Sequence, residues 1–231
     1  MSLRALCRSF CYTQNTIRYR VEWPRIAEAC RRVGSVGTLF DGGAGSGEFS
    51  RRLLNCGFCR EVIALEYDAA NFVQLERNLG RDPRARLVRG SVLEIPLPEK
   101  SVDMIMSTQV LEHIREHELA AAEFDRVLKP GGHAIITTPH PPEPFPNDGH
   151  FREGYTEADL RALFVPHGWE LLWTDYYLTK ETIGAMLRAQ KLPARGVFLP
   201  VAWVDKEKHL DAAGRKSRDP FGILTLFRKP A

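Results

Sequence analysis

Short apolar runs alternate with amphipathic stretches along most of the chain, and each short run predicts a strand. The predicted strands span residues 36–40, 61–66, 85–88, 102–106, 133–138, 169–178 and 221–228. Between them, apolar residues recur at helical spacing over residues 49–54, 69–79, 116–128 and 156–165. Strands that alternate with helices predict an α/β fold in which a mostly parallel sheet carries helices on both faces.

The end of the chain departs from this alternation, because no crossover helix is predicted between the last two strands. We therefore expect these two strands to pair antiparallel at one edge of the sheet. About forty residues, 179–219, separate them, and a loop of that length usually serves a site, so we interpret it as an insertion that forms a lid. Together with a helical segment over residues 1–34, the whole chain, 1–231, is expected to form one domain.

Composition narrows the functional classes. The chain has 32 basic and 29 acidic residues, a net charge of +3, and the two signs are interspersed, so no basic stripe predicts a nucleic-acid substrate. No apolar run is long enough to predict a membrane span. The segment before Glu22 is rich in arginine, as transit peptides are, but arginine is frequent throughout the chain, and we expect a cytoplasmic protein.

The cysteines give no sign of a disulfide framework or a metal centre. There are five, an odd number, which suits a reducing compartment. Cys56 and Cys59 form a C-x-x-C pair, but no second pair completes four zinc ligands, and no helix is predicted to begin at the first cysteine. We therefore predict no metal site.

The most informative motif is Asp41-Gly42-Gly43-Ala44-Gly45-Ser46-Gly47, which joins the first predicted strand to the first helix after it. Glycines allow a turn with unusual φ angles and let the backbone approach a ligand closely, so this motif predicts a nucleotide-sized cofactor. The dinucleotide fingerprint needs glycine at the first, third and sixth positions, yet the sixth position counted from Gly43 is Glu48. An NAD-dependent reductase is therefore disfavoured.

Further motifs follow in order along the chain. The second predicted strand ends in Ala64-Leu65-Glu66-Tyr67-Asp68, and the other matching segments are 90–96, 101–105, 110–114 and 126–132. With the glycine motif, this series resembles the class I S-adenosylmethionine (SAM)-dependent methyltransferases, and most closely their type 11 family. The resemblance covers residues 36–230.

The resemblance implies a Rossmann-like, seven-stranded class I methyltransferase fold with an antiparallel last strand. It also implies S-adenosyl-L-methionine as the cofactor, which leaves as S-adenosyl-L-homocysteine. The residues that it assigns to the cofactor are Asp41, Gly43, Gly45, Gly47, Glu66, Tyr67, Ser91, Val92, Thr108 and Gln109.

Each assigned residue has a role that its chemistry suits. The glycines let the backbone approach the methionine tail, and Asp41 holds the glycine loop or reaches the ammonium group through water. Glu66 offers two oxygens to the ribose hydroxyls, and Tyr67 stacks beside the adenine. Ser91 stands where the family often has aspartate, so its hydroxyl and the backbone of Val92 are expected at the adenine. The floor below the methionine moiety is expected to come from Thr108 and Gln109.

The loop after the fifth predicted strand carries the candidate catalytic residues, because ligands bind at the carboxyl ends of strands in such sheets. We predict His150 as the base that deprotonates a hydroxyl acceptor, with His140 as the second candidate. His113 is interpreted as a packing residue. The expected acceptor is a small molecule such as a sugar, a quinone or a natural product; N- or C-methylation and a non-catalytic SAM-binding regulator stay open, as does the oligomeric state.

Overall fold

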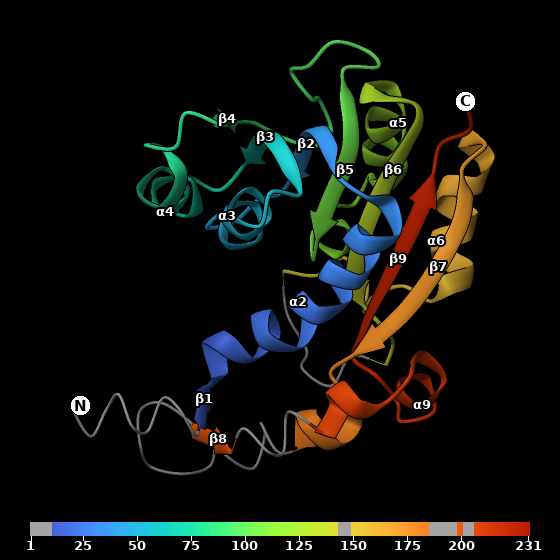
Figure 1. Cartoon of the computed structure of the whole chain (residues 1–231). Helices are drawn as coiled ribbons and strands as arrows, with labels where there is room; N and C mark the ends of the chain where they lie inside the picture. Colours follow the sequence, from blue (N-terminus) through green and yellow to red (C-terminus); the bar gives the residue numbers. More distant parts are fainter. Residues whose placement is uncertain (1–10, 143–148, 185–197, 201–205) are drawn as a thin grey trace.

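The computed structural model describes residues 11–142, 149–184, 198–200 and 206–231, and its centre is a seven-stranded sheet with the order β4-β3-β2-β5-β6-β9-β7 (Figure 1). The strands of this sheet are β2 (Val36–Gly42), β3 (Cys59–Glu66), β4 (Ala85–Arg89), β5 (Val102–Thr108), β6 (Leu128–Pro139), β7 (Glu170–Tyr177) and β9 (Gly222–Arg228). Neighbouring strands run parallel from β4 to β6, and β9 runs antiparallel to both β6 and β7. The predicted fold class is confirmed.

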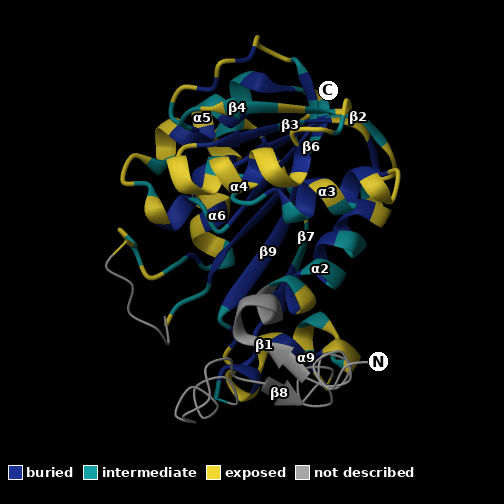
Figure 2. Ribbon diagram, turned by 90° about the vertical axis from the view of Figure 1, so that its left-hand side faces the viewer, coloured by how far each residue is buried: buried dark blue, intermediate teal, exposed yellow. Residues whose placement is uncertain are grey.

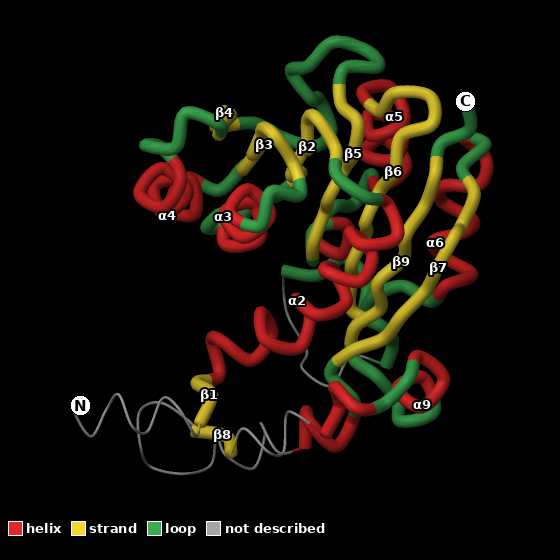
Figure 3. Tube along the Cα trace, viewed as in Figure 1, coloured by secondary structure: helices red, strands yellow, loops and turns green. Residues whose placement is uncertain are grey.

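Helices cover both faces of this sheet (Figure 3). They are α2 (Gln14–Val33), α3 (Glu48–Asn55), α4 (Ala69–Leu79), α5 (His117–Val127), α6 (Glu157–Phe164) and α9 (Ala212–Lys216), with short 3-10 helices η1 (Leu111–His113), η2 (Val165–His167) and η3 (Lys206–His209). Two short strands outside the main sheet, β1 (Cys11–Thr13) and β8 (Phe198–Pro200), pair antiparallel. None of the helices in the described part of the chain is both long and apolar enough to cross a membrane.

Successive residues of the central strands enter different cores, because side chains alternate between the two faces of a sheet. Leu39 and Met104 pack with apolar residues of α2, α3 and α4 on one face. Phe40 and Ile105, their neighbours in sequence, pack with α5 and α6 on the other face. The central strands are therefore apolar on both faces, and Figure 2 shows them buried inside the helices.

Two details of the sheet differ from the predictions. The fifth strand was expected to begin after the Pro130-Gly131-Gly132 turn, but β6 already begins at Leu128, which pairs with Val102. The pairing then shifts before His133, and Gly131 donates its N–H to the carbonyls of Lys229 and Pro230, so the turn is an irregularity inside the strand. The last two strands pair antiparallel at the edge of the sheet, as predicted; the detail that was not predicted is that β9 inserts between β6 and β7.

The interpretation of residues 179–219 as a lid falls partly outside the described residues, which omit 185–197 and 201–205. The described parts of this segment pack on the end of β7. Glu207 is buried and accepts hydrogen bonds from the backbone N–H groups of Leu178 and Thr179 at 2.6 and 3.1 Å. Arg215 forms a buried ion pair with Asp175 at 2.7 Å. A buried ion pair with both oxygens engaged fixes the position of α9 against the sheet.

Candidate active site

A single cavity of about 790 Å³ opens at the carboxyl ends of β2, β3 and β5, where ligands bind in open α/β sheets. Eight of the residues assigned to the cofactor line it: Gly43, Gly45, Glu66, Tyr67, Ser91, Val92, Thr108 and Gln109. The cavity continues from there to His113 and Phe151. It therefore has one end made of motif residues and another end made of later loops.

Gly43 and Gly45 in the glycine loop are required for different reasons. Gly43 has φ +83°, and a Cβ there would lie 2.3 Å from a methyl group of Val110, so no side chain fits. Gly45 has φ +56°, and a Cβ there would meet no atom within 4 Å, because the residue faces the cavity. The positive φ angles disfavour every other residue type at both positions. The loop thus presents bare backbone to a ligand.

Two residues assigned to the cofactor, Gly47 and Asp41, do not line the cavity, and for Asp41 this position fits the alternative in which it holds the glycine loop. A Cβ on Gly47 would lie 2.5 Å from Leu75 and 2.7 Å from Leu79, so this glycine lets the start of α3 approach α4. Asp41 is 2% exposed and accepts a hydrogen bond from the Ser50 hydroxyl at 2.5 Å. Gly47 and Asp41 therefore stabilise the glycine loop from outside the cavity.

Burial also changes the charge state of Asp41. It raises the pKa of this carboxyl to about 7; the Ser50 hydrogen bond works in the opposite direction, and the nearby Glu66 carboxylate adds to the rise. The charged form is disfavoured because the surroundings offer little solvation. Asp41 therefore carries a proton in a large fraction of the molecules at neutral pH.

Glu66 organises the cofactor end of the cavity. Its carboxylate accepts the N–H of Gly45 at 2.7 Å on one oxygen and the N–H of Asp68 at 2.8 Å on the other. A carboxylate oxygen can accept more than one hydrogen bond, so both oxygens keep capacity for a vicinal diol. Tyr67 follows with 76% of its surface exposed, and its ring can lie along a bound base.

The floor of the cavity is tied to the rest of the molecule through Gln109. Its side-chain amide donates to the hydroxyl of Tyr177 at 2.9 Å, and that hydroxyl donates to Glu22 at 3.1 Å. Glu22 also accepts from the Thr137 hydroxyl at 2.5 Å. The network links α2, β5, β6 and β7 below the place assigned to the methionine moiety, so the floor is fixed by buried hydrogen bonds.

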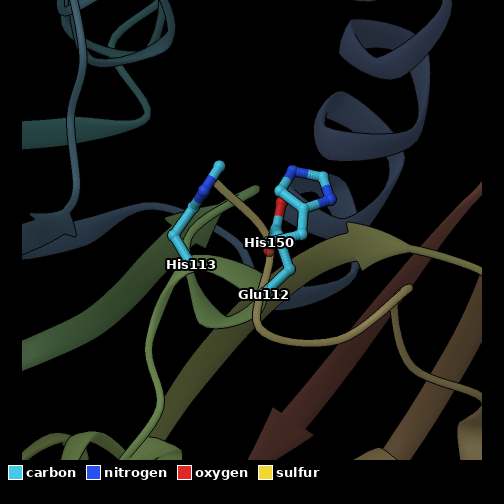
Figure 4. Close-up of side chains that lie close together, drawn as sticks. All are labelled: Glu112, His113 and His150. Atoms are coloured by element: carbon cyan, nitrogen blue, oxygen red, sulfur yellow. The ribbon is translucent and has the colours of Figure 1, made fainter. Parts of the chain in front are cut away.

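At the other end, His113 lines the cavity, whereas His150 and the buried Glu112 lie beside His113 and are not among the lining residues. The ring centroid of His113 lies 4.5 Å from that of His150, with the planes at 77°. Figure 4 shows both rings and the side chain of Glu112 converging from η1 and from the loop after β6. His113 Nδ1 lies 2.9 Å from the carbonyl oxygen of Gly149, which can only accept, so this nitrogen carries the proton when the bond forms.

Backbone contacts hold this loop against η1. Phe151 donates its N–H to the carbonyl of Glu112 at 2.8 Å. The guanidinium of Arg152 donates to the carbonyls of Ile114 and Arg115 at 2.6 and 3.2 Å. Two segments that are distant in sequence thus form one rigid unit. The sequence analysis interpreted His113 as a packing residue, although its position shortly after a sheet strand is a signal for ligand contact, and the structure places it in the cavity lining.

The predicted second base, His140, lies away from the cavity. Its ring packs against Tyr176 with the centroids 5.6 Å apart, and its backbone N–H donates to the carbonyl of Phe221. Burial lowers the pKa of this imidazole, so it stays neutral and acts as a packing group. His140 is not among the residues that line the cavity, and its catalytic role stays a prediction.

Residues 40–136 match the family model described as "Methyltransferase domain". A "Probable S-adenosylmethionine-dependent methyltransferase" of Mycolicibacterium smegmatis is 32% identical over 160 residues, which are 67% of this chain and 58% of that protein. A demethylmenaquinone methyltransferase of Renibacterium salmoninarum is 30% identical over 125 residues, 54% of this chain and 49% of that protein. The chain spans about half the length of the curated relatives that it matches.

Solved structures share the fold at low identity. An S-adenosylmethionine-dependent methyltransferase from Mesorhizobium loti has a TM-score of 0.63 and 18% identity, over 90% of this chain and 97% of that one. Phosphoethanolamine N-methyltransferase 2 of Haemonchus contortus, solved in complex with S-adenosyl-L-methionine, has a TM-score of 0.63 and 16% identity, over 90% of this chain and 53% of that one. The [4+2]-cyclase SpnF also aligns, with a TM-score of 0.63, 18% identity and coverage of 90% and 80%, so the fold alone does not fix the reaction.

Proposed function

Because this chain belongs to the S-adenosylmethionine-dependent class I methyltransferases, we propose that it transfers the methyl group of SAM to a hydroxyl group of a small molecule. One observation carries the proposal: a single cavity joins the motif residues of the cofactor end to the imidazole of His113. A donor and an acceptor bound at its two ends would share one enclosed space. Such an arrangement suits direct transfer between them.

The cofactor end has the groups that SAM requires. The bare backbone at Gly45 leaves room for the methionine tail, and Glu66 offers acceptor oxygens for the ribose hydroxyls. Ser91 and Val92 line the same cavity at the place proposed for the adenine. Ser91 Oγ accepts the N–H of Leu93 at 3.1 Å, so its own hydroxyl proton can be donated elsewhere.

The reaction itself needs alignment more than it needs reactive side chains. The bond between sulfur and the methyl carbon breaks as the bond between the acceptor oxygen and that carbon forms, and the hydroxyl proton leaves. Holding donor and acceptor in line contributes on the order of 7–11 kcal/mol. Removal of the hydroxyl proton by a positioned group contributes roughly 10²–10⁴-fold in rate.

The acceptor end supports a hydroxyl acceptor because it places imidazoles beside the space for the substrate. His113 faces that space, and His150 lies directly beside it. The prediction named His150 as the base and His140 as the second candidate; we now propose His113 as the partner of His150 in proton removal. Phe151 adds an aromatic surface at the same end, which suits an acceptor that carries a ring.

The test is methyl transfer from SAM labelled in its methyl group to a panel of phenols, catechols, sugars, quinones and amines. Quinones are included because one relative is named for such a substrate. We expect a labelled methyl ether and one S-adenosyl-L-homocysteine per product, both measured by mass spectrometry, and inhibition by added S-adenosyl-L-homocysteine. Label found only on nitrogen or carbon would replace the hydroxyl acceptor, and tight SAM binding without any transfer would favour a regulator.

A further inference from the structure

We propose that Glu112, His113 and His150 form a binding site for a divalent transition metal, of which Zn²⁺ is the best match. Each residue offers one ligand atom, and the three atoms lie within 4.8 Å of one another. In the described part of the chain, this is the one group of three such residues that meets that distance. No spacing of residues along the chain indicates this group, because His150 lies far in sequence from Glu112 and His113.

The donor set suits this class of metal. Two imidazole nitrogens with one carboxylate oxygen are a ligand set of catalytic zinc sites, which keep a further position open for water or substrate. Bonds of about 2.0–2.2 Å allow two ligand atoms to be at most about 4.3 Å apart, so the observed spacing closes with small side-chain rotations. Mg²⁺ and Ca²⁺ are disfavoured because they prefer oxygen ligands.

The hydrogen bond of His113 is an independent observation that points to a metal ligand. Its Nδ1 faces the carbonyl oxygen of Gly149 at 2.9 Å, so the proton lies on Nδ1 and the lone pair on Nε2. Imidazoles that bind metals commonly donate their second nitrogen to a carbonyl in this way, which fixes the tautomer and the ring orientation. The ring is therefore held in the form that can bind a cation.

The site is also pre-organised. Glu112 is fully buried, and its backbone carbonyl accepts the N–H of Phe151, so the loop that carries His150 is attached directly to the segment that carries the other two ligands. Arg152, on the same loop, directs its guanidinium to the carbonyls of Leu111, Ile114 and Arg115 and to the hydroxyl of Tyr155. A buried carboxylate next to two imidazoles is well compensated by a divalent cation between them.

The position of the site indicates its use, which rests on the proposed function. His113 lines the cavity, so an open coordination position of the metal would face the acceptor. A metal ion lowers the pKa of a hydroxyl that it binds. With a metal bound, the two imidazoles would act as ligands in place of their role as bases. The acceptor would lose its proton to solvent and attack the methyl carbon as a metal-bound alkoxide or phenoxide, the bond between sulfur and methyl would break, and the metal would be left unchanged.

Metal binding can be tested without SAM or an acceptor. After treatment with a chelator, the protein is titrated with Zn²⁺ by calorimetry and with Co²⁺ by visible absorption. We expect one equivalent per chain and a Co²⁺ spectrum typical of nitrogen and oxygen ligands. Glu112→Gln, His113→Asn and His150→Asn should each weaken binding by about tenfold or more.

Three controls keep the result interpretable. His167→Asn changes a histidine of η2, outside the cavity, and should bind Zn²⁺ as the wild type does. Cys56→Ser tests for binding at the exposed cysteine. SAM affinity of every variant shows that it is folded. The proposal is overturned if the wild type binds no stoichiometric Zn²⁺, if the three ligand variants bind like the wild type, or if Cys56→Ser removes the bound metal.

A second measurement separates the metal site from the proposed function. With a hydroxyl acceptor, the metal-free protein should have a lower kcat and an unchanged SAM affinity, and Zn²⁺ should restore kcat. Full activity without metal would overturn the catalytic role while the binding data decide on the site. If the site binds Zn²⁺ but no hydroxyl acceptor is methylated, the proposed function fails and the site remains.

Discussion

The two ends of the cavity are built in different ways. The cofactor end comes from one short loop and the end of the neighbouring strand, and its geometry is carried by backbone groups such as the N–H of Gly45. The end proposed for the acceptor comes from η1 and a loop after β6, and it is lined by the side chains of His113 and Phe151, with His150 packed against His113. Backbone geometry is dictated by local sequence, whereas side chains from distant loops depend on how those loops pack.

Each end also contains a buried carboxylate, and the two have different neighbours. Glu66 is 7% exposed and accepts backbone N–H groups on both oxygens. Glu112 is fully buried and lies beside two imidazoles. The first carboxylate holds the glycine loop through backbone N–H groups, and we propose that the second belongs to a site for a proton or a metal. Variants at one end should therefore change donor binding, and variants at the other end should change turnover.

The largest effect is expected from Gly45→Val. A side chain at this position enters the space for the methionine tail, and valine also disfavours the φ of +56°, so SAM binding should be lost. Gly57→Val is the matched control, because Gly57 has φ +72° and open space around its Cβ but lies outside the cavity. Calorimetry with SAM measures both; equal affinity in the two variants would remove the glycine loop from the site.

The next effect is expected on turnover. His113→Ala should lower kcat with a hydroxyl acceptor by roughly 10²–10⁴-fold, because the group that handles the hydroxyl proton is removed, while SAM affinity stays near that of the wild type. His167→Ala, outside the cavity, should change neither quantity. Steady-state kinetics and calorimetry together decide. A fall in SAM affinity that matches the fall in kcat would show that the two ends are not separable.

Glu66→Ala should have the opposite pattern to His113→Ala, with weaker SAM binding and a nearly unchanged kcat. SAM should bind more weakly by about 1.5–3 kcal/mol, the range for hydrogen bonds to a charged group, and kcat at saturating SAM should change little. Glu76→Ala, an exposed position on α4, serves as the matched control. SAM affinity in the Glu66 variant equal to that of the control would contradict the role given to this carboxylate.

The smallest effect concerns the support behind the glycine loop and is a matter of pH. The pKa of Asp41 is raised from 3.8 to about 7, so between these values the folded chain holds a proton that the unfolded chain releases. The free energy of unfolding should therefore fall as pH rises through this window, by up to about 1.4 kcal/mol per pH unit.

Asp41→Asn should remove this part of the pH dependence and leave the rest. Urea unfolding at pH 5.5, 6.3 and 7 gives the free energy of unfolding of the wild type and of the variant. The difference between the two free energies should change with pH by up to about 1.4 kcal/mol per pH unit. SAM affinity should change little, because Asp41 lies outside the cavity lining. If the free energy of unfolding depends on pH in the same way in both proteins, Asp41 is charged in the folded chain.

The sequence predicted the fold well because the sheet obeys local rules. Strands such as β2 are apolar on both faces and each is followed by a clear turn, so their positions along the chain could be predicted from the sequence. The irregularity at Gly131 was not, because its N–H pairs with the carbonyls of Lys229 and Pro230 at the other end of the chain. A contact of that range has no local signature.

The site was predicted unevenly for the same reason. Gly45 and Glu66 belong to contiguous motifs, and both line the cavity. Gly47 belongs to the same motif but packs on Leu75, since a glycine pattern does not tell ligand contact from helix contact. His113 gains its place only when the loop at Phe151 docks on η1, a tertiary event that the spacing of residues cannot reveal.

The place of β9 has a consequence for how the protein is made on the ribosome. This strand is the last in chain order, yet it lies between β6 and β7, so neither can complete its hydrogen bonds until β9 has been synthesised. At about 5–20 residues per second, β6 waits for several seconds with an open edge after it leaves the ribosome. Open edges of apolar strands invite pairing with other chains. The nascent protein therefore has an open apolar edge, and a higher risk of aggregation, in the interval before β9 emerges.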